Sequence, residues 1–597
     1  MLEECLSQLP EHLCEVSVCP PQECFTVMPE PMRARWHARA TAACAAGLAP
    51  ITAADWLRFS ENGDRARYEA LYFSRRRRLT DLVCGVLSDG PERCMDEILN
   101  TLWAICEESA WQLPAHNTYV RDAPALTWPD VERPVVDLFA AETGALLACT
   151  CAVLDKALPE SVGRRIKYEV ERRVLAPCAA THFWWMGSGD EPMNNWTPWC
   201  TQNVLLCVFA LPYPQQMRRT VVTQAARSLD CFLKDYGPDG CCNEGAQYYS
   251  HAGLCLFGCL ELLCAAAPGV FDDLWHTHKI RNIAAYIHHM HVDGPYYVNF
   301  ADCSPFAGRR GAREYLFAQR TENPDMARFA ARDWQISLTS PDESRDIARI
   351  NLWYQLLEVR AAADMAGDAG GLPPSPPSDI YYPSAGVFLA RRGRWFLAAK
   401  AGCNADNHNH NDTGSVILYR DGRPFLIDLG VESYTQKTFS SRRYEIWTMQ
   451  SQWHNLPTFD DIQQKDGAAF CASDVHTSFS PDTAEISMNL SAAWPEAARL
   501  EYFTRTVRLT EKSFFLHDVC FGEYKTAFLS LMLCETPHID NCRVCVDTLG
   551  TLFFEGADGP AEVDTLPITD ARLRIAWPAV LYRLRIPFTN TLTVRAE

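Results

Sequence analysis

The hydrophobic pattern changes its period once along this chain, and that change limits the folds open to it. From about residue 30 to residue 366, apolar residues recur at three- and four-residue steps, which predicts helices almost throughout. Beyond residue 380 the period is two, which predicts antiparallel strands. Between them, Gly367 to Asp379 has a linker composition that includes the run Pro373-Pro374-Ser375-Pro376-Pro377. We therefore expect an α+β multidomain protein with a helical domain at residues 1–370, a linker at 371–379 and a β domain at 380–597.

Particular stretches carry each pattern. Helices are expected at Asp64–Leu87, Arg93–Glu107, Val135–Leu158, Gln215–Leu233, Ala246–Ala267 and Glu343–Met365. About a dozen helices joined by short loops predict stacked helical hairpins, as a toroid or a solenoid. Strands are expected at Val387–Ala390, Arg394–Ala399, Arg499–Leu509, Ser513–Val519, Ala527–Leu533 and Leu581–Arg585. An antiparallel domain of about 200 residues is large enough for stacked sheets.

The net charge of −19 restricts the partners of this 597-residue chain. It argues against nucleic acid and against an anionic membrane as the main partner. It does not exclude an acidic substrate, because a cleft can be locally basic on an acidic protein. The run Arg75-Arg76-Arg77-Arg78 is either such a patch or, as we expect, a solvated helix face with structural ion pairs.

The 26 cysteines are scattered, and Cys542 with Cys545 is an isolated pair without a second pair at zinc-site spacing. The first residues lack the basic and apolar regions of a signal peptide. We therefore expect a cytoplasmic protein with free thiols, although a chain trimmed of its signal would look the same. The most apolar stretch, Leu254 to Phe271, contains Glu261 and Pro268 and is expected to be a buried helix.

Three histidines and an aspartate between His408 and Asn455 are the strongest candidates for a functional site. The segment opens with His408-Asn409-His410, and a hairpin from Ser415 to Asp428 follows, turned on Asp421-Gly422. This turn sets Arg420 opposite Arg423 and, counting back, Asp428 opposite Ser415. On an extended segment, His408 and His410 share one face. With Asp428 and His454 they make a nitrogen and oxygen metal set with an open position, and the alternative is a group of surface histidines.

Two stretches of the helical half carry further candidates. The first, Trp184-Trp185 followed by Asn194-Asn195-Trp196-Thr197-Pro198-Trp199, offers stacking platforms for sugar rings and amide donors for carboxylates. Its alternative is a buried aromatic cluster with one Asn as a helix cap. The second is a Gly-containing turn that leads into a helix with Glu244 in its first turn. Tyr248, Tyr249 and His251 follow, and since Tyr248 and Tyr249 would point about 100° apart on a helix, only one is expected to enter a site.

The order of these motifs resembles that of the heparinase II/III-like polysaccharide lyases. The resemblance rests on Asn195 in a Trp-rich loop, Tyr249 after Glu244-Gly245, His408-Asn409-His410, Asp428 and His454-Asn455. It covers nearly the whole chain and implies an incomplete (α/α) toroid followed by an antiparallel β-sandwich. It also implies β-elimination on uronate-containing chains such as heparan sulfate, chondroitin, hyaluronan or alginate.

The resemblance also implies roles for residues. A uronate C5 proton leaves only if the adjacent carboxylate is neutralised, and Asn195 and His408 are assigned to that task, which stabilises an enolate-like transition state. Tyr249 is the acid and base, with Tyr248 as the alternative. Beyond these roles, Trp196, Trp199, Glu244, Tyr248, His251 and Arg443 are expected to line the substrate site. The alternative for Arg443 is an ion pair with an acidic neighbour inside the β domain. Some relatives have His beside the neutralising Asn where this chain has Trp196, which leaves the accepted uronate open.

His410, Asp428 and His454 match the family's metal-ligand positions. We expect one divalent ion, zinc by its ligands, with manganese or calcium as alternatives, and a mainly structural role. The expected partner is an acidic polysaccharide or oligosaccharide.

Two other functions remain open at this point. A uronate C5-epimerase would need the same neutraliser and tyrosine but would return a proton to C5. A non-catalytic carbohydrate-binding protein could keep the fold without the chemistry.

Overall fold

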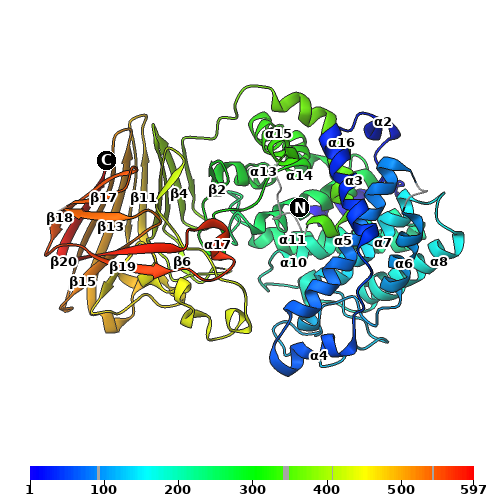
Figure 1. Ribbon diagram of the computed structural model, residues 1–597, viewed down its shortest axis with the longest axis horizontal. Coiled ribbons are helices and arrows are strands. Elements are labelled where there is room, and N and C mark those ends of the chain that lie inside the picture. The colour runs from blue at the N-terminus through cyan, green and yellow to red at the C-terminus, as the bar shows by residue number, and fades with distance from the viewer. Residues whose placement is uncertain (91–93, 340–347, 407, 541–542) are drawn as a thin grey trace. The chain divides into compact units, whose positions relative to one another are not determined.

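The computed structural model describes residues 1–90, 94–339, 348–406, 408–540 and 543–597 (Figure 1). The chain divides into two compact units. Unit 1 comprises residues 1–236, 250–284 and 308–374, and unit 2 comprises residues 237–249, 285–307 and 375–597. The division at Pro374 and Ser375 falls inside the expected linker. Two segments that precede the linker nevertheless belong to unit 2, which the linear division into domains did not anticipate.

The region before the linker is helical, as predicted. Its helices are α1 (Leu2–Cys5), α2 (Gln22–Thr26), α3 (Glu30–Ala45), α4 (Ala53–Asn62), α5 (Ala66–Asp89), α6 (Met95–Cys106), α7 (Leu138–Val153), α8 (Glu160–Val170), α9 (Ala176–Ala180), α10 (Trp196–Ala210), α11 (Gln215–Asp235), α12 (Gly253–Ala266), α13 (His278–Met290), α14 (Ala312–Arg320), α15 (Pro324–Thr339) and α16 (Leu352–Ala369).

Neighbouring helices of unit 1 pack in pairs along the chain. α3 packs on α5, α14 on α15 and α15 on α16, while α10 contacts α7, α11 and α12. α7, α10 and α12 are apolar on nearly every side and are buried, as expected of helices at the centre of a helical unit. The window from Tyr248 to Ala266 has the length and apolarity of a membrane span, but 83% of it is buried inside the protein.

The predicted helices are found with shifted ends. The expected helix Ala246–Ala267 is a 3₁₀ turn at Tyr248–Ser250 followed by α12, and Glu244 lies in the turn before it. Part of the last expected helix, Glu343 to residue 347, lies outside the described residues, as does Cys542. All cysteines in the described ranges are free thiols.

The arginine run in α5 is not solvated, contrary to expectation. Arg75, Arg76 and Arg78 are buried, and the first two share Glu108, with their Nη1 atoms 2.7 and 2.8 Å from its Oε1. The expected ion pairs therefore exist, but they lie inside the helical unit and form no basic patch.

The region after the linker is rich in antiparallel strands, as predicted. The strands of the structure are β1 (His291–Asp293), β2 (Tyr296–Tyr297), β3 (Asp379–Tyr382), β4 (Val387–Arg392), β5 (Trp395–Lys400), β6 (Cys403–Asn404), β7 (Val416–Arg420), β8 (Arg423–Leu426), β9 (Pro457–Phe459), β10 (Gly467–Cys471), β11 (Ser473–Phe479), β12 (Thr483–Asn489), β13 (Leu500–Thr510), β14 (Phe514–Gly522), β15 (Ala527–Leu533), β16 (Pro537–Asp540), β17 (Arg543–Val546), β18 (Gly550–Ala557), β19 (Glu562–Pro567) and β20 (Val580–Ala596), with the short helix α17 (Leu573–Ala576) before β20.

Two sheets form the core of unit 2. One has five strands in the order β3-β4-β5-β7-β8, and the other has eleven strands, in which β20 pairs with β14, β15, β18 and β19. Alternate residues of both sheets, such as Phe388 and Leu397 from the first and Ile486 and Val507 from the second, meet in one hydrophobic cluster. Burial alternates along β12 and β13 of the eleven-stranded sheet, which explains the period of two there, whereas every residue of β5 in the five-stranded sheet is buried.

The hairpin that carries Asp428 is found where it was predicted, with one change of register. β7 and β8 turn on Asp421-Gly422, and Arg420 faces Arg423. The register then shifts between Tyr419, opposite Pro424, and Leu418, opposite Leu426. Pro424 has no N–H for the ladder, which suits this irregular position. The prediction that Asp428 lies opposite Ser415 assumed an unbroken register. It was wrong, because the register shifts between the turn and these residues.

Candidate active site and metal centre

The loop from His408 to Asp412 is not the extended segment expected from the sequence. His408 has a φ of 57°, in the left-handed region that favours glycine. The two histidines nevertheless reach one partner. His408 Nδ1 lies 3.0 Å from Oδ2 of Asp302, and His410 Nε2 lies 3.0 Å from Oδ1 of the same carboxylate.

Asp302 is the centre of this group, and sequence reasoning missed it. Its fully buried carboxylate also accepts from Arg443 Nη2 at 2.6 Å and from the Tyr434 hydroxyl at 3.3 Å. Burial alone would raise the pKa of Asp302, but the hydrogen bonds from both histidines and the charge of Arg443 hold that pKa far below its usual value. The carboxylate therefore stays ionised and orients four side chains at once.

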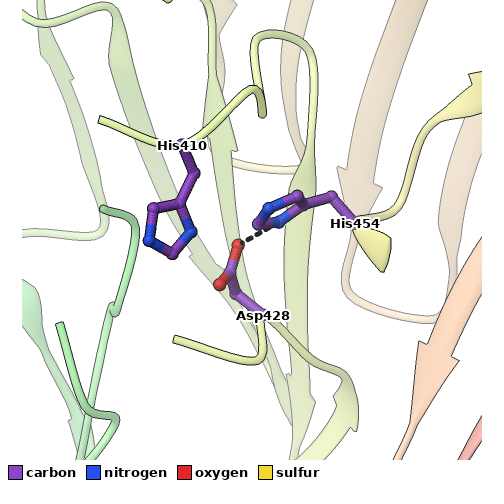
Figure 2. A group of neighbouring side chains, drawn as sticks. All are labelled: His410, Asp428 and His454. Atoms are coloured by element: carbon purple, nitrogen blue, oxygen red, sulfur yellow. Dashed lines mark hydrogen bonds and ion pairs between the residues drawn. The ribbon is translucent and has the colours of Figure 1, made fainter. Parts of the chain in front are cut away.

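His410, Asp428 and His454 form a fully buried group in which one candidate ligand atom of each lies within 4.8 Å of the others. Figure 2 shows the Asp428 carboxylate beside both imidazole rings. His454 Nδ1 lies 2.9 Å from Asp428 Oδ2. Burial favours the neutral forms, but the mutual attraction of this pair lowers the pKa of Asp428 and raises that of His454.

Two nitrogens of this group, His410 Nδ1 and His454 Nε2, are buried and have no hydrogen-bond partner among the residues that the structure describes. An unpaired nitrogen in a protein interior costs free energy, and a cation would satisfy both. The Asp302 carboxylate behind His410 is the kind of partner that orients metal-binding imidazoles. Two nitrogens and a carboxylate therefore fit a divalent cation such as zinc.

Buried polar contacts hold the backbone around this group. The Asn455 amide donates to the carbonyls of Val416 at 2.6 Å and Ile427 at 3.0 Å, and its oxygen accepts from Met532 N at 2.7 Å. Arg505 donates to the carbonyls of Gly414 and Asn455, both at 2.8 Å. The loops that carry His410, Asp428 and His454 are therefore fixed to the sheet with or without an ion.

Tyr248 is the tyrosine that contacts His408. The two rings stack with centroids 4.5 Å apart and planes 18° apart, and the Tyr248 hydroxyl hydrogen-bonds the Tyr434 hydroxyl. Burial raises the pKa of Tyr248 well above its usual value, Tyr434 adds to that rise, and the charge of Arg572 opposes it. Tyr249 is fully buried, with its ring centroid 5.7 Å from that of Tyr286. The structure thus brings the sequence's alternative, Tyr248, into the group.

A glycine makes this placement possible. Gly245 has a φ of 89°, and a Cβ there would lie 3.1 Å from Cys303 Cβ and 3.2 Å from the Phe300 carbonyl. The loop of Glu244 and Tyr248 can therefore approach the segment that ends at Asp302. Glu244 Oε2 lies 3.5 Å from His408 Nε2, so the structure places Glu244 beside this histidine, and its contact with substrate stays a prediction.

Arg443 supports the loop that carries both histidines. Besides its ion pair with Asp302, its Nη2 donates to the Asn409 carbonyl at 3.0 Å, between the two histidines of the motif. This is the ion-paired alternative weighed for Arg443, and a contact with substrate stays a prediction.

The predicted residues of the helical half lie in unit 1. Trp196 packs against Trp184 and His116, and the Trp199 ring stacks on His251 with centroids 3.9 Å apart. Burial and the charge of Arg313 lower the pKa of His251 to about 3, so this ring is neutral at physiological pH. Asn195 is a buried N-cap residue of α10. These residues form an aromatic group, and their part in catalysis stays a prediction.

Sequence reasoning missed Asp302, Tyr434 and Arg572. They lie in irregular segments whose residues show no periodic pattern. The one signal for Asp302 is an isolated acid at the end of the apolar stretch that begins at Tyr296.

The C-terminal part of this chain is similar to a known protein family. Residues 374–551 match the family described as heparinase II/III-like, C-terminal, which confirms the resemblance predicted from the motifs between His408 and Asn455. No match was found among the curated proteins.

Solved structures with the same fold include a heparinase III and a chondroitin AC lyase. A crystal structure of heparinase III has a TM-score of 0.60 and 14% identity, over 100% of this chain and 88% of that chain. A Streptomyces coelicolor A3 chondroitin AC lyase in complex with chondroitin sulphate has a TM-score of 0.53 and 11% identity, over 95% of this chain and 80% of that chain. At these identities the likeness establishes a shared fold.

Proposed function

We propose that this chain, which carries a heparinase II/III-like C-terminal domain over residues 374–551, is a polysaccharide lyase that cleaves uronate-containing glycans by β-elimination. On this proposal unit 1 is the incomplete (α/α) toroid of such enzymes, and the two sheets of unit 2 are the antiparallel β-sandwich. The observation that carries the proposal is the stacked pair of Tyr248 and His408, held by Asp302.

The proposed chemistry begins at His408. Asp302 holds the ring through Nδ1, and Nε2 lies 3.5 Å from Glu244 Oε2, so an incoming uronate carboxylate would meet Nε2 beside Glu244. An N–H at that nitrogen can donate to the uronate carboxylate and stabilise the charge that develops as the C5 proton leaves. Asn195 is proposed for the same task on the resemblance alone.

Tyr248 is proposed as the acid and base. In elimination, the bond between C4 and the glycosidic oxygen breaks as the Tyr248 phenol gives its proton to that leaving oxygen. The C5 proton passes to the phenolate oxygen left on Tyr248, and the electron pair of the C5–H bond forms the C4–C5 double bond. The raised pKa of Tyr248 keeps its phenol protonated, which suits donation to the leaving oxygen. Its contact with the Tyr434 hydroxyl gives that proton a neighbour through which it can be exchanged.

The metal role is proposed as structural. His410, Asp428 and His454 would hold one divalent cation, with zinc favoured by the ligand types. A bound ion would supply cross-linking of three loops of unit 2, and none of the steps above passes through it.

The test is absorbance of the unsaturated uronate product. The full chain would be incubated with hyaluronan, chondroitin sulfate, heparan sulfate and alginate, beside the variants Tyr248→Phe and Tyr249→Phe. We expect absorbance to rise with the wild type and with Tyr249→Phe, and to be lost with Tyr248→Phe. No rise on any chain would reject the lyase. Deuterium uptake at C5 without cleavage would then establish the epimerase, and binding without either would establish a carbohydrate-binding protein.

A further inference from the structure

One arginine beside the tyrosine pair, Arg572, has no carboxylate within ion-pair distance among the described residues, and Asp302 acts on it only at longer range. Arg572 lies in the segment between β19 and β20, just before α17 and beyond the residues that match the family model. It is half-buried, and within the described residues it forms no ion pair. By contrast, the neighbouring Arg443 is already paired with Asp302 at 2.6 Å.

The guanidinium of Arg572 is fixed in place. Its carbon lies 4.5 Å from the centroid of the Tyr434 ring, the ring whose hydroxyl meets that of Tyr248. Its Nη2 donates to Gln247 Oε1 and to the Asp302 carbonyl, both at 3.3 Å. These neutral partners orient the group without forming an ion pair with it.

The segment that carries Arg572 is also tied down. The Asp570 carboxylate accepts from the backbone N–H groups of Arg572 and Leu573, both at 3.0 Å, and from that of Ser433 at 3.1 Å. The Trp577 indole donates to the Leu429 carbonyl at 2.9 Å. Ser433 adjoins Tyr434, which contacts Tyr248, and Leu429 adjoins Asp428 of the candidate metal group. The segment that includes α17 is therefore attached beside both Tyr434 and Asp428.

We infer that Arg572 binds an anionic substituent of the substrate, a carboxylate or a sulfate, next to Tyr248. This inference rests on the proposed function and deepens it. A guanidinium is always charged and presents a planar set of donors that matches carboxylate and sulfate oxygens. Since the protein carries a net charge of −19, an oriented positive group that makes no direct ion pair within the described residues is the feature that would draw an acidic chain to the candidate site.

The test is calorimetric binding of a heparan sulfate oligosaccharide, and of the same oligosaccharide after chemical desulfation, to the full chain. Arg572→Met removes the charge and keeps a side chain that packs on Tyr434. Arg574→Met, two residues along, removes the same charge from an exposed side chain and is the matched control. We expect binding to weaken roughly tenfold to a hundredfold in Arg572→Met, with partial recovery in Arg572→Lys and no change in the control.

Each outcome has one meaning. Weaker binding of both oligosaccharides assigns a uronate carboxylate to Arg572, and weaker binding of the sulfated form alone assigns a sulfate. Unchanged binding in Arg572→Met, with an unchanged melting temperature, overturns the inference. Failure of the lyase proposal would be seen separately, as wild-type protein that binds these chains without releasing an absorbing product.

Discussion

Two histidine groups lie on either side of Asp302, and they differ in almost everything else. His410, Asp428 and His454 are fully buried, and two of their ring nitrogens have no hydrogen-bond partner. His408 is partly exposed. The Tyr248 ring stacks on its face, and the carboxylates of Asp302 and Glu244 lie beside its Nδ1 and Nε2 atoms.

The difference shows how one motif can serve two purposes. A closed site with unpaired nitrogens suits a ligand that is small and permanent, such as a cation. A half-open site with a raised-pKa phenol and a fixed imidazole suits a ligand that arrives, reacts and leaves. His408 and His410 are only two residues apart, so burial separates the roles more than sequence position does.

The largest effect should come from removing the Tyr248 hydroxyl. We expect kcat of Tyr248→Phe to fall by roughly 10²–10⁴, the usual contribution of a positioned acid or base, while metal content stays at the wild-type level. Product absorbance and elemental analysis on the same preparations measure both quantities. Tyr249→Phe is the matched control. A larger loss in the control than in Tyr248→Phe would return the role to Tyr249.

An intermediate effect should come from Asp302, because it contacts both groups. In Asp302→Asn the amide offers one acceptor where the carboxylate offered two, and it leaves Arg443 without its counter-charge. We expect kcat and metal affinity each to fall by about 10–100-fold, as for other residues that orient metal ligands.

The contrast with Tyr248→Phe sharpens the comparison. If Asp302→Asn keeps its metal and loses only activity, then Asp302 orients His408 alone and the two groups are independent. If it loses metal and keeps kcat, then its contact with His408 has no role in the reaction.

Most of the stretches named from the sequence are found with ends shifted by a few residues, although β20 runs well beyond its expected end. The change of period marked the start of the strand-rich region, because strands with one buried face, such as β12 and β13, alternate apolar and polar residues. The Asp421-Gly422 turn was predictable because few dipeptides suit a two-residue hairpin. The register shift at Pro424 was not predictable, because opposite residues were assigned by counting along the hairpin as if its pairing were unbroken.

The candidate site was predicted in part for a similar reason. His408, His410, Asp428 and His454 stand out because histidines are rare and close in sequence. Asp302 meets His408 across 106 residues, and Arg572 meets the Asp302 carbonyl across 270, so no local pattern reports either contact. The expectation that only one of Tyr248 and Tyr249 enters a site assumed a regular helix, and the structure has a 3₁₀ turn there. Tyr249 itself was chosen by the resemblance.

The smallest effect on the reaction should come from removing the metal. Chelation at neutral pH should lower the melting temperature of unit 2 by roughly 5–10 °C, the shift expected when a ligand present at about 100 times its Kd is withdrawn from a native state. Activity measured well below the new transition should fall by less than about tenfold, because Asn455 and Arg505 hold the same loops without an ion. Calorimetry before and after chelation, with zinc added back, measures the first quantity, and product absorbance the second. An unchanged melting temperature would show that the buried nitrogens bind no cation. Complete loss of activity while the protein stays folded would place the cation in the reaction. The two histidine groups would then no longer have separate roles.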